Sequence, residues 1–253
     1  MGEEAKGYGG AGETTRACPS WGSHVRGDRL RRTLLPRLPM IPLLAEDLQT
    51  YIHLHTTPEP EIFDELRRET EASLPDPEMQ VGRVEGTFLK LMVQVTGAKR
   101  ILELGTYSGY SALAMASGLP QGGTIITCDV DPQATAVARR YFDRSPWGDK
   151  IEIAVAPAAD TLAQLAQDGA EFDLVFIDAD KESYCEYWEA VLPMVPSGGV
   201  ILADNTLKSG AVLDPKDPSD HGIVAFNHKV QGDPRVEQVL LSVRDGVMLC
   251  RVL

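Results

Sequence analysis

Apolar and polar residues follow two periodicities along this chain, and together they predict alternating strands and helices. Short, β-rich apolar runs that stop abruptly at charged or small residues are typical of buried parallel strands. Such runs occupy residues 99–105, 124–130, 150–156, 172–177 and 199–203. The segments between them place apolar residues at helical spacing, at 108–118, 132–144, 160–167 and 182–192. This order predicts an α/β fold with a doubly wound parallel sheet and right-handed crossovers.

The last two apolar runs break the alternation. Residues 236–243 and 246–253 are separated only by Arg244 and Asp245. The Asp-Gly pair at 245–246 is a strong signal for a tight β-hairpin. We therefore expect the final strand to run antiparallel to its neighbour.

Helical spacing also occurs outside this alternation, at residues 43–55, 60–73, 82–96 and 222–232. The apolar face expected for the third of these helices consists of Val84, Phe88, Leu91, Met92 and Val95. Residues 1–39 lack such periodicity and are rich in Gly, Arg and Ser. We expect a disordered leader over 1–39, followed by one domain over 40–253. Because ordered-looking sequence begins at Met40, a translation start there is a further hypothesis, which the mass of the native protein would test.

Composition narrows the classes of function. The chain is 43% hydrophobic over 253 residues, which is enough for one sizeable core. Its 24 Lys and Arg against 37 Asp and Glu give a formal charge of −13, which argues against a nucleic-acid partner. No apolar run approaches the roughly 20 residues needed to span a bilayer, and no signal-peptide core is present. The four cysteines are not spaced as a zinc site or as a redox pair, which fits a reducing compartment. Together, these features lead us to expect a cytoplasmic protein with no membrane partner.

Carboxylate and amide side chains follow two of the predicted strands, at the point where each strand ends. They are Asp178, Asp180, Asp204 and Asn205, with Lys181 beside the first pair. In open α/β sheets, ligands bind beyond the carboxyl ends of the strands. Carboxylate and amide oxygens are ligands for Mg²⁺ or Ca²⁺, and a lysine adds a possible base. The sequence therefore predicts a cation and a base in one crevice.

A glycine-containing turn follows the first strand, in the segment ELGTYSGYS at 103–111. Its glycines, Gly105 and Gly109, do not form the G-x-G-x-x-G fingerprint of a dinucleotide site, which disfavours a dehydrogenase. Asp129 ends the next strand, where an acid suits the two hydroxyls of a ribose. These features favour a nucleoside cofactor without a pyrophosphate. By itself, the turn is equally compatible with a loop that only packs a helix against a strand.

With these motifs in order, the chain resembles the cation-dependent O-methyltransferases that include catechol and caffeoyl-CoA O-methyltransferase. The similarity covers residue 40 to the C-terminus and rests on LELGTYSGYS, CDVDP, FIDADK and ADN. It implies a seven-stranded Rossmann-like sheet with an antiparallel last strand, preceded by helices. It also implies S-adenosylmethionine (SAM) as cofactor, Mg²⁺ or another divalent cation such as Ca²⁺ or Mn²⁺, and a homodimer.

The resemblance further implies roles for individual residues. The expected cofactor contacts are Met79, Glu103, Gly105, Tyr107, Ser111, Asp129 and Asp178. The expected metal ligands are Asp178, Asp204 and Asn205, and Lys181 is the expected base, acting with Asp178. Asp180 is expected to face solvent or the surroundings of the cofactor.

The resulting hypothesis is methyl transfer from SAM to a hydroxyl of a small vicinal dihydroxy aromatic acceptor, as in secondary-metabolite synthesis. The alternative is a non-catalytic SAM-binding protein that acts as a dimeric interaction module, but such a protein needs neither metal ligands nor Lys181. Lys208 stands where many relatives carry an aromatic residue. It either meets an acidic acceptor or is an ordinary solvated loop lysine.

Overall fold

The computed structural model describes residues 44–253. The leader expected over 1–39 and the start expected at Met40 lie outside the described residues. The remainder of the domain expected over 40–253 forms one compact unit with a central sheet.

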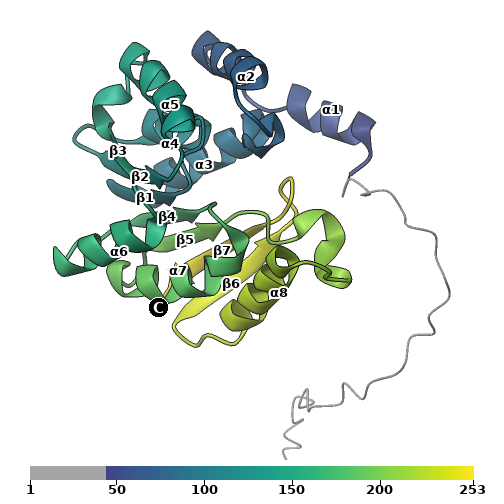
Figure 1. Ribbon diagram of the computed structural model, residues 1–253, viewed down its shortest axis with the longest axis vertical. Coiled ribbons are helices and arrows are strands. Elements are labelled where there is room, and N and C mark those ends of the chain that lie inside the picture. The colour runs from purple at the N-terminus through teal and green to yellow at the C-terminus, as the bar shows by residue number, and fades with distance from the viewer. Residues whose placement is uncertain (1–43) are drawn as a thin grey trace, which may run out of the picture. The chain divides into compact units, whose positions relative to one another are not determined.

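Within residues 44–253, seven strands form one sheet with the order β3-β2-β1-β4-β5-β7-β6 (Figure 1). The strands are β1 (Arg100–Leu104), β2 (Thr124–Asp129), β3 (Ile151–Val155), β4 (Leu174–Ile177), β5 (Val200–Ala203), β6 (Val236–Leu241) and β7 (Val247–Val252). Strands β1 to β5 pair in parallel, whereas β7 runs antiparallel to both β5 and β6. The predicted doubly wound sheet with an antiparallel last strand is confirmed.

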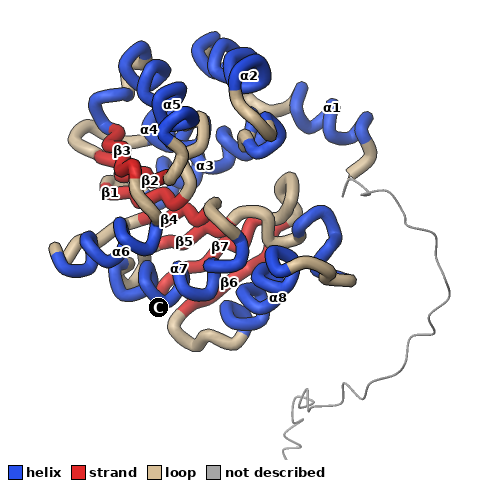
Figure 2. The backbone as a smooth tube through the Cα atoms, in the orientation of Figure 1, coloured by secondary structure: helices blue, strands red, loops and turns tan. Residues whose placement is uncertain are grey.

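Helices cover both faces of this sheet (Figure 2). They are α1 (Glu46–Leu54), α2 (Glu61–Ser73), α3 (Gly82–Thr96), α4 (Tyr110–Gly118), α5 (Pro132–Arg144), α6 (Ala158–Gln167), α7 (Tyr184–Val191) and α8 (Pro218–Gln231). Alternation along β1 divides the core in two: Ile101 packs with residues of α3, α4 and α5, whereas Leu102 packs with residues of α6, α7 and α8. Both faces are buried because a parallel sheet needs cover on each side.

Two predictions from the helical pattern are wrong in detail. The helix expected at 222–232 begins at Pro218, because Asp217 and Asp220 form a reciprocal cap ahead of it. The apolar face expected for α3 is also rotated, since Leu91 and Val95 are exposed. The buried residues of α3 are Glu85, Gly86, Leu89 and Val93.

The strand register brings the acidic segments together. Ile177 of β4 pairs with Ala203 of β5, and Leu104 of β1 pairs with Ile177 on the other side. The residues that follow these strands therefore leave the sheet at one edge. No helix among residues 44–253 is long and apolar enough to cross a membrane.

Candidate functional site

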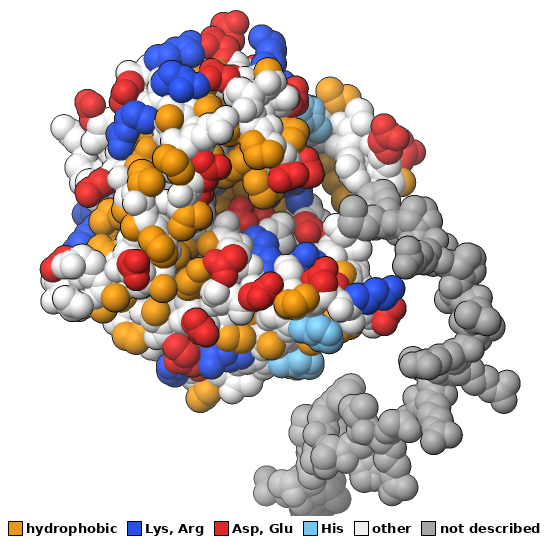
Figure 3. Space-filling view, in the orientation of Figure 1, with side chains coloured by type: hydrophobic (Ala, Val, Ile, Leu, Met, Phe, Trp, Pro, Cys, Tyr) orange, Lys and Arg blue, Asp and Glu red, His pale blue; other side chains and the backbone are white. Residues whose placement is uncertain are grey.

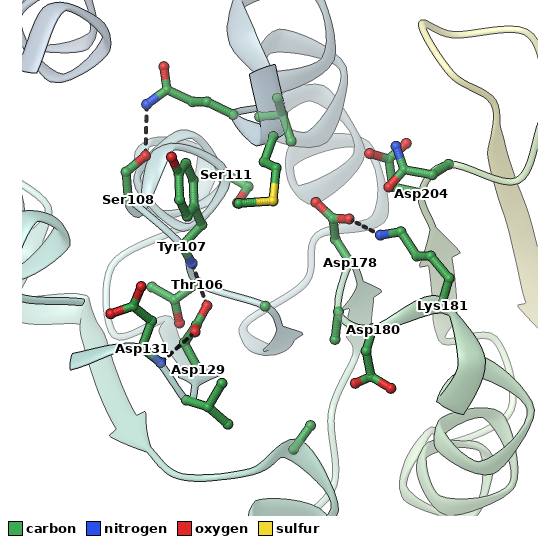
Figure 4. Close-up of a pocket in the computed structure, with 18 of the residues that line it drawn as sticks. Thr106, Tyr107, Ser108, Ser111, Asp129, Asp131, Asp178, Asp180, Lys181 and Asp204 are labelled. Atoms are coloured by element: carbon green, nitrogen blue, oxygen red, sulfur yellow. Dashed lines mark hydrogen bonds and ion pairs between the residues drawn. The ribbon is translucent and has the colours of Figure 1, made fainter. Parts of the chain in front are cut away.

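A cavity of about 820 Å³ lies at the carboxyl ends of the parallel strands, where Figure 3 shows this face hollowed across its middle. The predicted site residues that line it are Met79, Gly105, Tyr107, Ser111, Asp129, Asp178, Lys181, Asp204 and Asn205, together with Asp180. They come from the end of β2, from the segments that follow β1, β4 and β5, from α4 and from the segment before α3. The structure therefore brings together every predicted site residue except Glu103 (Figure 4).

The turn after β1 requires glycine for two reasons. Gly105 has φ +101°, in the region that favours glycine, and a Cβ there would lie 2.0 Å from the carbonyl oxygen of Asp178. Gly109 has φ +86°, and its Cβ would lie 2.6 Å from the ring of Phe142. The turn thus packs directly on β4 and α5, which leaves its outer side open to the cavity.

Asp129 is held rigidly at the end of β2. Its Oδ2 accepts the backbone N–H of Tyr107 at 2.7 Å, and its Oδ1 accepts that of Asp131 at 2.9 Å. Each carboxylate oxygen keeps acceptor capacity for a further donor. A pair of vicinal hydroxyls is therefore a suitable ligand for this end of the cavity.

Glu103 is buried within the structure and does not line the cavity. Its Oε2 accepts the hydroxyl of Thr127 at 2.5 Å, and its Oε1 has no partner among residues 44–253. Burial raises the pKa of this carboxyl to about 8. Glu103 thus lies in the core, and a direct contact between Glu103 and the cofactor stays a prediction.

Lys181 connects the strand end to α7. Its Nζ donates to Asp178 Oδ1 at 2.7 Å and to the hydroxyl of Tyr184 at 3.0 Å. Burial lowers the pKa of Lys181, but the neighbouring carboxylate outweighs this effect and holds the pKa above its usual value. Lys181 is therefore a cation in this state. Tyr184 is fully buried and packs against Phe226, which anchors the pair.

Asp204 and Glu85 form a second buried group, of which only Asp204 was predicted from the sequence. Asp204 is 3% exposed and Glu85, from α3, is fully buried. Asp204 Oδ1 and Glu85 Oε1 accept no hydrogen bond from a donor among residues 44–253, but the two carboxyls lie close enough to share a proton. Burial and the charge of Asp178 raise the pKa of Asp204 to about 7, and burial and the charge of Asp204 raise that of Glu85 well above its usual value. The helical spacing of Glu85 with Leu89 and Val93 was the signal that could have located it.

The residues predicted to hold a cation fit that role chemically. Within the described chain, no three acidic, His or Cys side chains lie close enough to form a metal centre by themselves. The candidate set instead combines the carboxylates of Asp178 and Asp204 with the amide of Asn205, all of which line the cavity. The grouping of Asp204 with Asp178 and Glu85 is the strongest sign of fit, because buried carboxyls brought close together are costly unless a proton or a cation offsets their charge.

The other candidate residues lie at the edge of the cavity. Met79 is 53% exposed, in a short 3₁₀ turn before α3. Asp180 is exposed, as expected, and accepts a hydrogen bond from Tyr187. Lys208 lines the cavity, but its Nζ lies 3.5 Å from Asp220 Oδ1, so its charge already has a partner.

Comparison with known proteins gives consistent matches. The family model described as O-methyltransferase matches residues 53–253. A caffeoyl-CoA O-methyltransferase of Zea mays is 38% identical over 223 residues, which covers 83% of this chain and 84% of the relative. A catechol O-methyltransferase of Niastella koreensis is 39% identical over 170 residues, which covers 66% of this chain and 77% of the relative.

Solved structures give the same result. An O-methyltransferase from Bacillus cereus in complex with SAH matches with a TM-score of 0.76 and 32% identity, covering 82% of this chain and 97% of the other. An O-methyltransferase of tomaymycin synthesis from Streptomyces achromogenes, in complex with SAM, matches with a TM-score of 0.73 and 29% identity. The latter match covers 81% of this chain and 96% of the other.

The close approach of Gly105 to β4 leads to a first prediction. Gly105→Ala should lower the free energy of unfolding by about 1–3 kcal/mol more than Gly122→Ala does, because the new Cβ must displace backbone. Gly122 is the matched control, since it also has positive φ (+76°) but nothing lies within 4 Å of an added Cβ. Urea unfolding of both variants measures the difference. Equal losses would show that the turn does not pack on β4 as described.

The buried Glu103 leads to a second prediction. Its pKa is about 8 in the folded chain against 4.5 for the ordinary group, so the folded state holds a proton that the unfolded state loses between these pH values. The stability contributed by this group therefore falls as pH rises from about 4.5 to 8. Glu103→Gln should remove this dependence. As pH rises, the free energy of unfolding of the variant should therefore increase relative to that of the wild type, by at most about 1.4 kcal/mol per pH unit.

Unfolding experiments at pH 5 and 8 on metal-free protein test this sign. Glu152→Gln is the control, because Glu152 lies exposed on β3. A constant difference between Glu103→Gln and wild type across this range would contradict the burial of an uncharged Glu103.

Proposed function

This chain belongs to the O-methyltransferase family and is a SAM-dependent enzyme, and we propose that it methylates one hydroxyl of a small aromatic vicinal diol with the help of a divalent cation. The relatives named for catechol and for caffeoyl-CoA support an aromatic acceptor. The single observation that carries the proposal is the grouping of Asp178, Asp204, Asn205 and Lys181 in the same cavity as the glycine turn and Asp129.

On the cofactor side, the proposed roles follow from position. Asp129 would accept the ribose hydroxyls of SAM, since both its oxygens are already fixed by backbone N–H groups. The Gly105 turn packs against the segment after β4, and its cavity side would present backbone N–H groups to the ligand. Met79, Tyr107 and Ser111 would contact the methionine part, and all three line this cavity. These contacts would orient the methyl group for in-line transfer to an oxygen held nearby.

Asp178, Asp204 and Asn205 would hold the cation, Mg²⁺ in the first instance, with Ca²⁺ and Mn²⁺ as alternatives. When bound, the cation would supply Lewis acidity that favours an ionised acceptor hydroxyl and would hold both oxygens of the diol. The support is the donor set itself, which consists of two carboxylates and an amide, with the Asp204 carboxyl buried beside a second acidic group. Because Asp178 and Asp204 raise each other's energy when both are charged, a positive group between them would relieve that repulsion.

Lys181 would accept the proton of the acceptor hydroxyl, with Asp178 as its partner. Its ammonium is at present stabilised by that carboxylate, 2.7 Å away. If Asp178 also bound the cation, its carboxylate would stabilise the Lys181 ammonium less. The pKa of Lys181 would then fall, and its amine would become a base. Tyr184 would keep the amine in position, because its hydroxyl is tied to the backbone carbonyls of Ile177 and Asp204.

A non-catalytic SAM-binding module is not favoured, since the relatives are named as methyltransferases. The expected homodimer stays a prediction. The exposed apolar residues Leu48, Tyr51 and Leu54 on α1 offer a surface that a second subunit would cover.

The proposal makes a direct prediction about metal removal. Wild-type protein with SAM should methylate caffeate, and dialysis against EDTA should reduce the rate by more than about 100-fold, because the cation contributes several kcal/mol to charge stabilisation. Addition of Mg²⁺ in excess of EDTA should restore the rate. Mass spectrometry of the methylated acid measures all three states. Chelated protein that works at full speed would contradict the metal-assisted mechanism.

A further inference from the structure

A second cavity, of about 700 Å³, adjoins the cavity of the candidate site and has no role in the proposal above. It lies between α1, the beginning of α3 and the loop that joins β6 to β7. Both cavities are lined by Gln80, Val81, Arg244 and Asp245. A ligand held in the first cavity therefore has a neighbouring space into which a substituent can extend.

The charged groups of the second cavity are mainly basic, although the chain as a whole carries a formal charge of −13. They are Arg83, Arg244 and one acid, Asp245, and His53 also lines the cavity. Asp245 Oδ1 already accepts the backbone N–H and the hydroxyl of Ser209. Basic groups along a concave wall raise the local concentration of anions. This cavity is thus suited to a negatively charged substituent.

The two arginines differ in the donors they have left. Arg83 uses all three guanidinium nitrogens: Nε and Nη2 donate to the carbonyls of Thr57 and Thr56, and Nη1 lies 3.4 Å from His53 Nε2. Arg83 therefore anchors the segment between α1 and α2. A further ligand would have to displace these contacts.

Arg244 uses one nitrogen only. Its Nη1 donates to the carbonyl of Gln80 at 3.1 Å, to that of Val81 and to Glu85 Oε2 at 3.2 Å. Its Nε and Nη2 make no hydrogen bond within residues 44–253, and its side chain is 40% exposed. The guanidinium is consequently fixed by one nitrogen while its other N–H groups remain available. A planar donor group of this kind matches a carboxylate better than a lysine ammonium does.

The backbone conformation of Arg244 is also unusual. Its φ is +43°, in the left-handed region, where a residue other than glycine costs about 1–2 kcal/mol. Gly246, with φ +91°, completes the turn and packs against Leu207. A strained backbone persists only where its surroundings determine it, and here the contacts of Arg244 with α3 do so.

We propose that the second cavity receives the substituent of the aromatic acceptor that lies away from its diol, and that Arg244 binds a carboxylate on that substituent. This inference rests on the proposed function. Glu85 is the positioning residue, since its buried carboxyl holds Nη1 and so orients the remaining N–H groups. Lys208, which lines the first cavity, is the alternative partner for such a carboxylate. It does not line the second cavity, and its ammonium already pairs with Asp220.

The test compares caffeate with its uncharged methyl ester on Mg²⁺-loaded enzyme. Arg244→Gln should raise KM for caffeate about 10- to 100-fold, as expected for loss of a hydrogen-bonded charge pair. Its kcat for caffeate should change little, and its KM for methyl caffeate should change less than about threefold. Arg244→Lys should recover only part of the caffeate affinity, because it restores the charge without the planar donors.

Two further variants separate the explanations. Lys216→Gln is the control, since Lys216 is 73% exposed in its side chain and lines neither cavity. Lys208→Gln should leave the ratio of the two KM values unchanged, and a selective loss of caffeate there would assign the carboxylate to Lys208 and overturn the proposal. Caffeoyl-CoA is a third acceptor. An Arg244→Gln effect confined to it would point to phosphate instead of carboxylate recognition and would also overturn the proposal.

Calorimetry of acceptor binding to the Mg²⁺- and SAH-loaded protein makes the test independent of turnover. A variant that is partly unfolded loses binding sites for both acceptors equally, whereas the proposal requires a selective loss of caffeate affinity. Equal loss of affinity for caffeate and its methyl ester would show that Arg244 only supports the structure of the site, and would overturn the proposal. Wild-type protein that methylates neither acceptor but shows the selective binding would contradict the proposed function alone.

Discussion

The rest of this site depends on one constraint, the close grouping of carboxylates at the ends of two adjacent parallel strands. The pairing of Ile177 with Ala203 places Asp178 and Asp204 at the same edge of the sheet. Helix α3 then adds Glu85 from above the sheet, fully buried. Buried carboxylates are unfavourable unless cations or hydrogen bonds offset them, so the arrangement of the surrounding basic residues follows from this grouping.

Each basic residue near this group has a distinct position. Lys181 lies on the β4 side and pairs with Asp178, while Arg244 reaches from the β6–β7 loop to Glu85. The Lys181 pair faces the cavity proposed for SAM and the cation, and Arg244 stands where the two cavities meet. In our account, the groups that balance charge around the metal ligands are therefore the same groups that contact the acceptor.

The sequence predicted the strand ends well, for a physical reason. A buried strand needs uninterrupted apolar residues, so the abrupt change to Asp178 and Asp204 marks both the end of the strand and the edge of the sheet. The Asp-Gly pair at 245–246 likewise predicted the hairpin, because turn geometry is set locally. The proposed metal ligands and the proposed base, Lys181, were predicted from such local signals together with the family resemblance.

Residues whose role depends on tertiary packing were missed. Glu85 was not among the predicted site residues. The apolar face expected for α3 included Leu91 and Val95, and only packing against the sheet decides which face is buried. Arg244 looked like an ordinary turn residue, since its partners Gln80 and Glu85 are more than 150 positions away in sequence. Glu103 was predicted to contact the cofactor, which stays a prediction, and strand alternation places its side chain in the core.

The most direct measurement of the central claim is the binding of Mn²⁺ to metal-free protein, followed by electron paramagnetic resonance. Our account predicts one Mn²⁺ per chain, with affinity reduced at least about 10-fold in Asp204→Asn. The same change at Asp214, which is exposed and lines neither cavity, should leave the affinity unaltered. Absence of bound Mn²⁺, or equal affinity in wild type and Asp204→Asn, would contradict the grouping of carboxylates as a cation site.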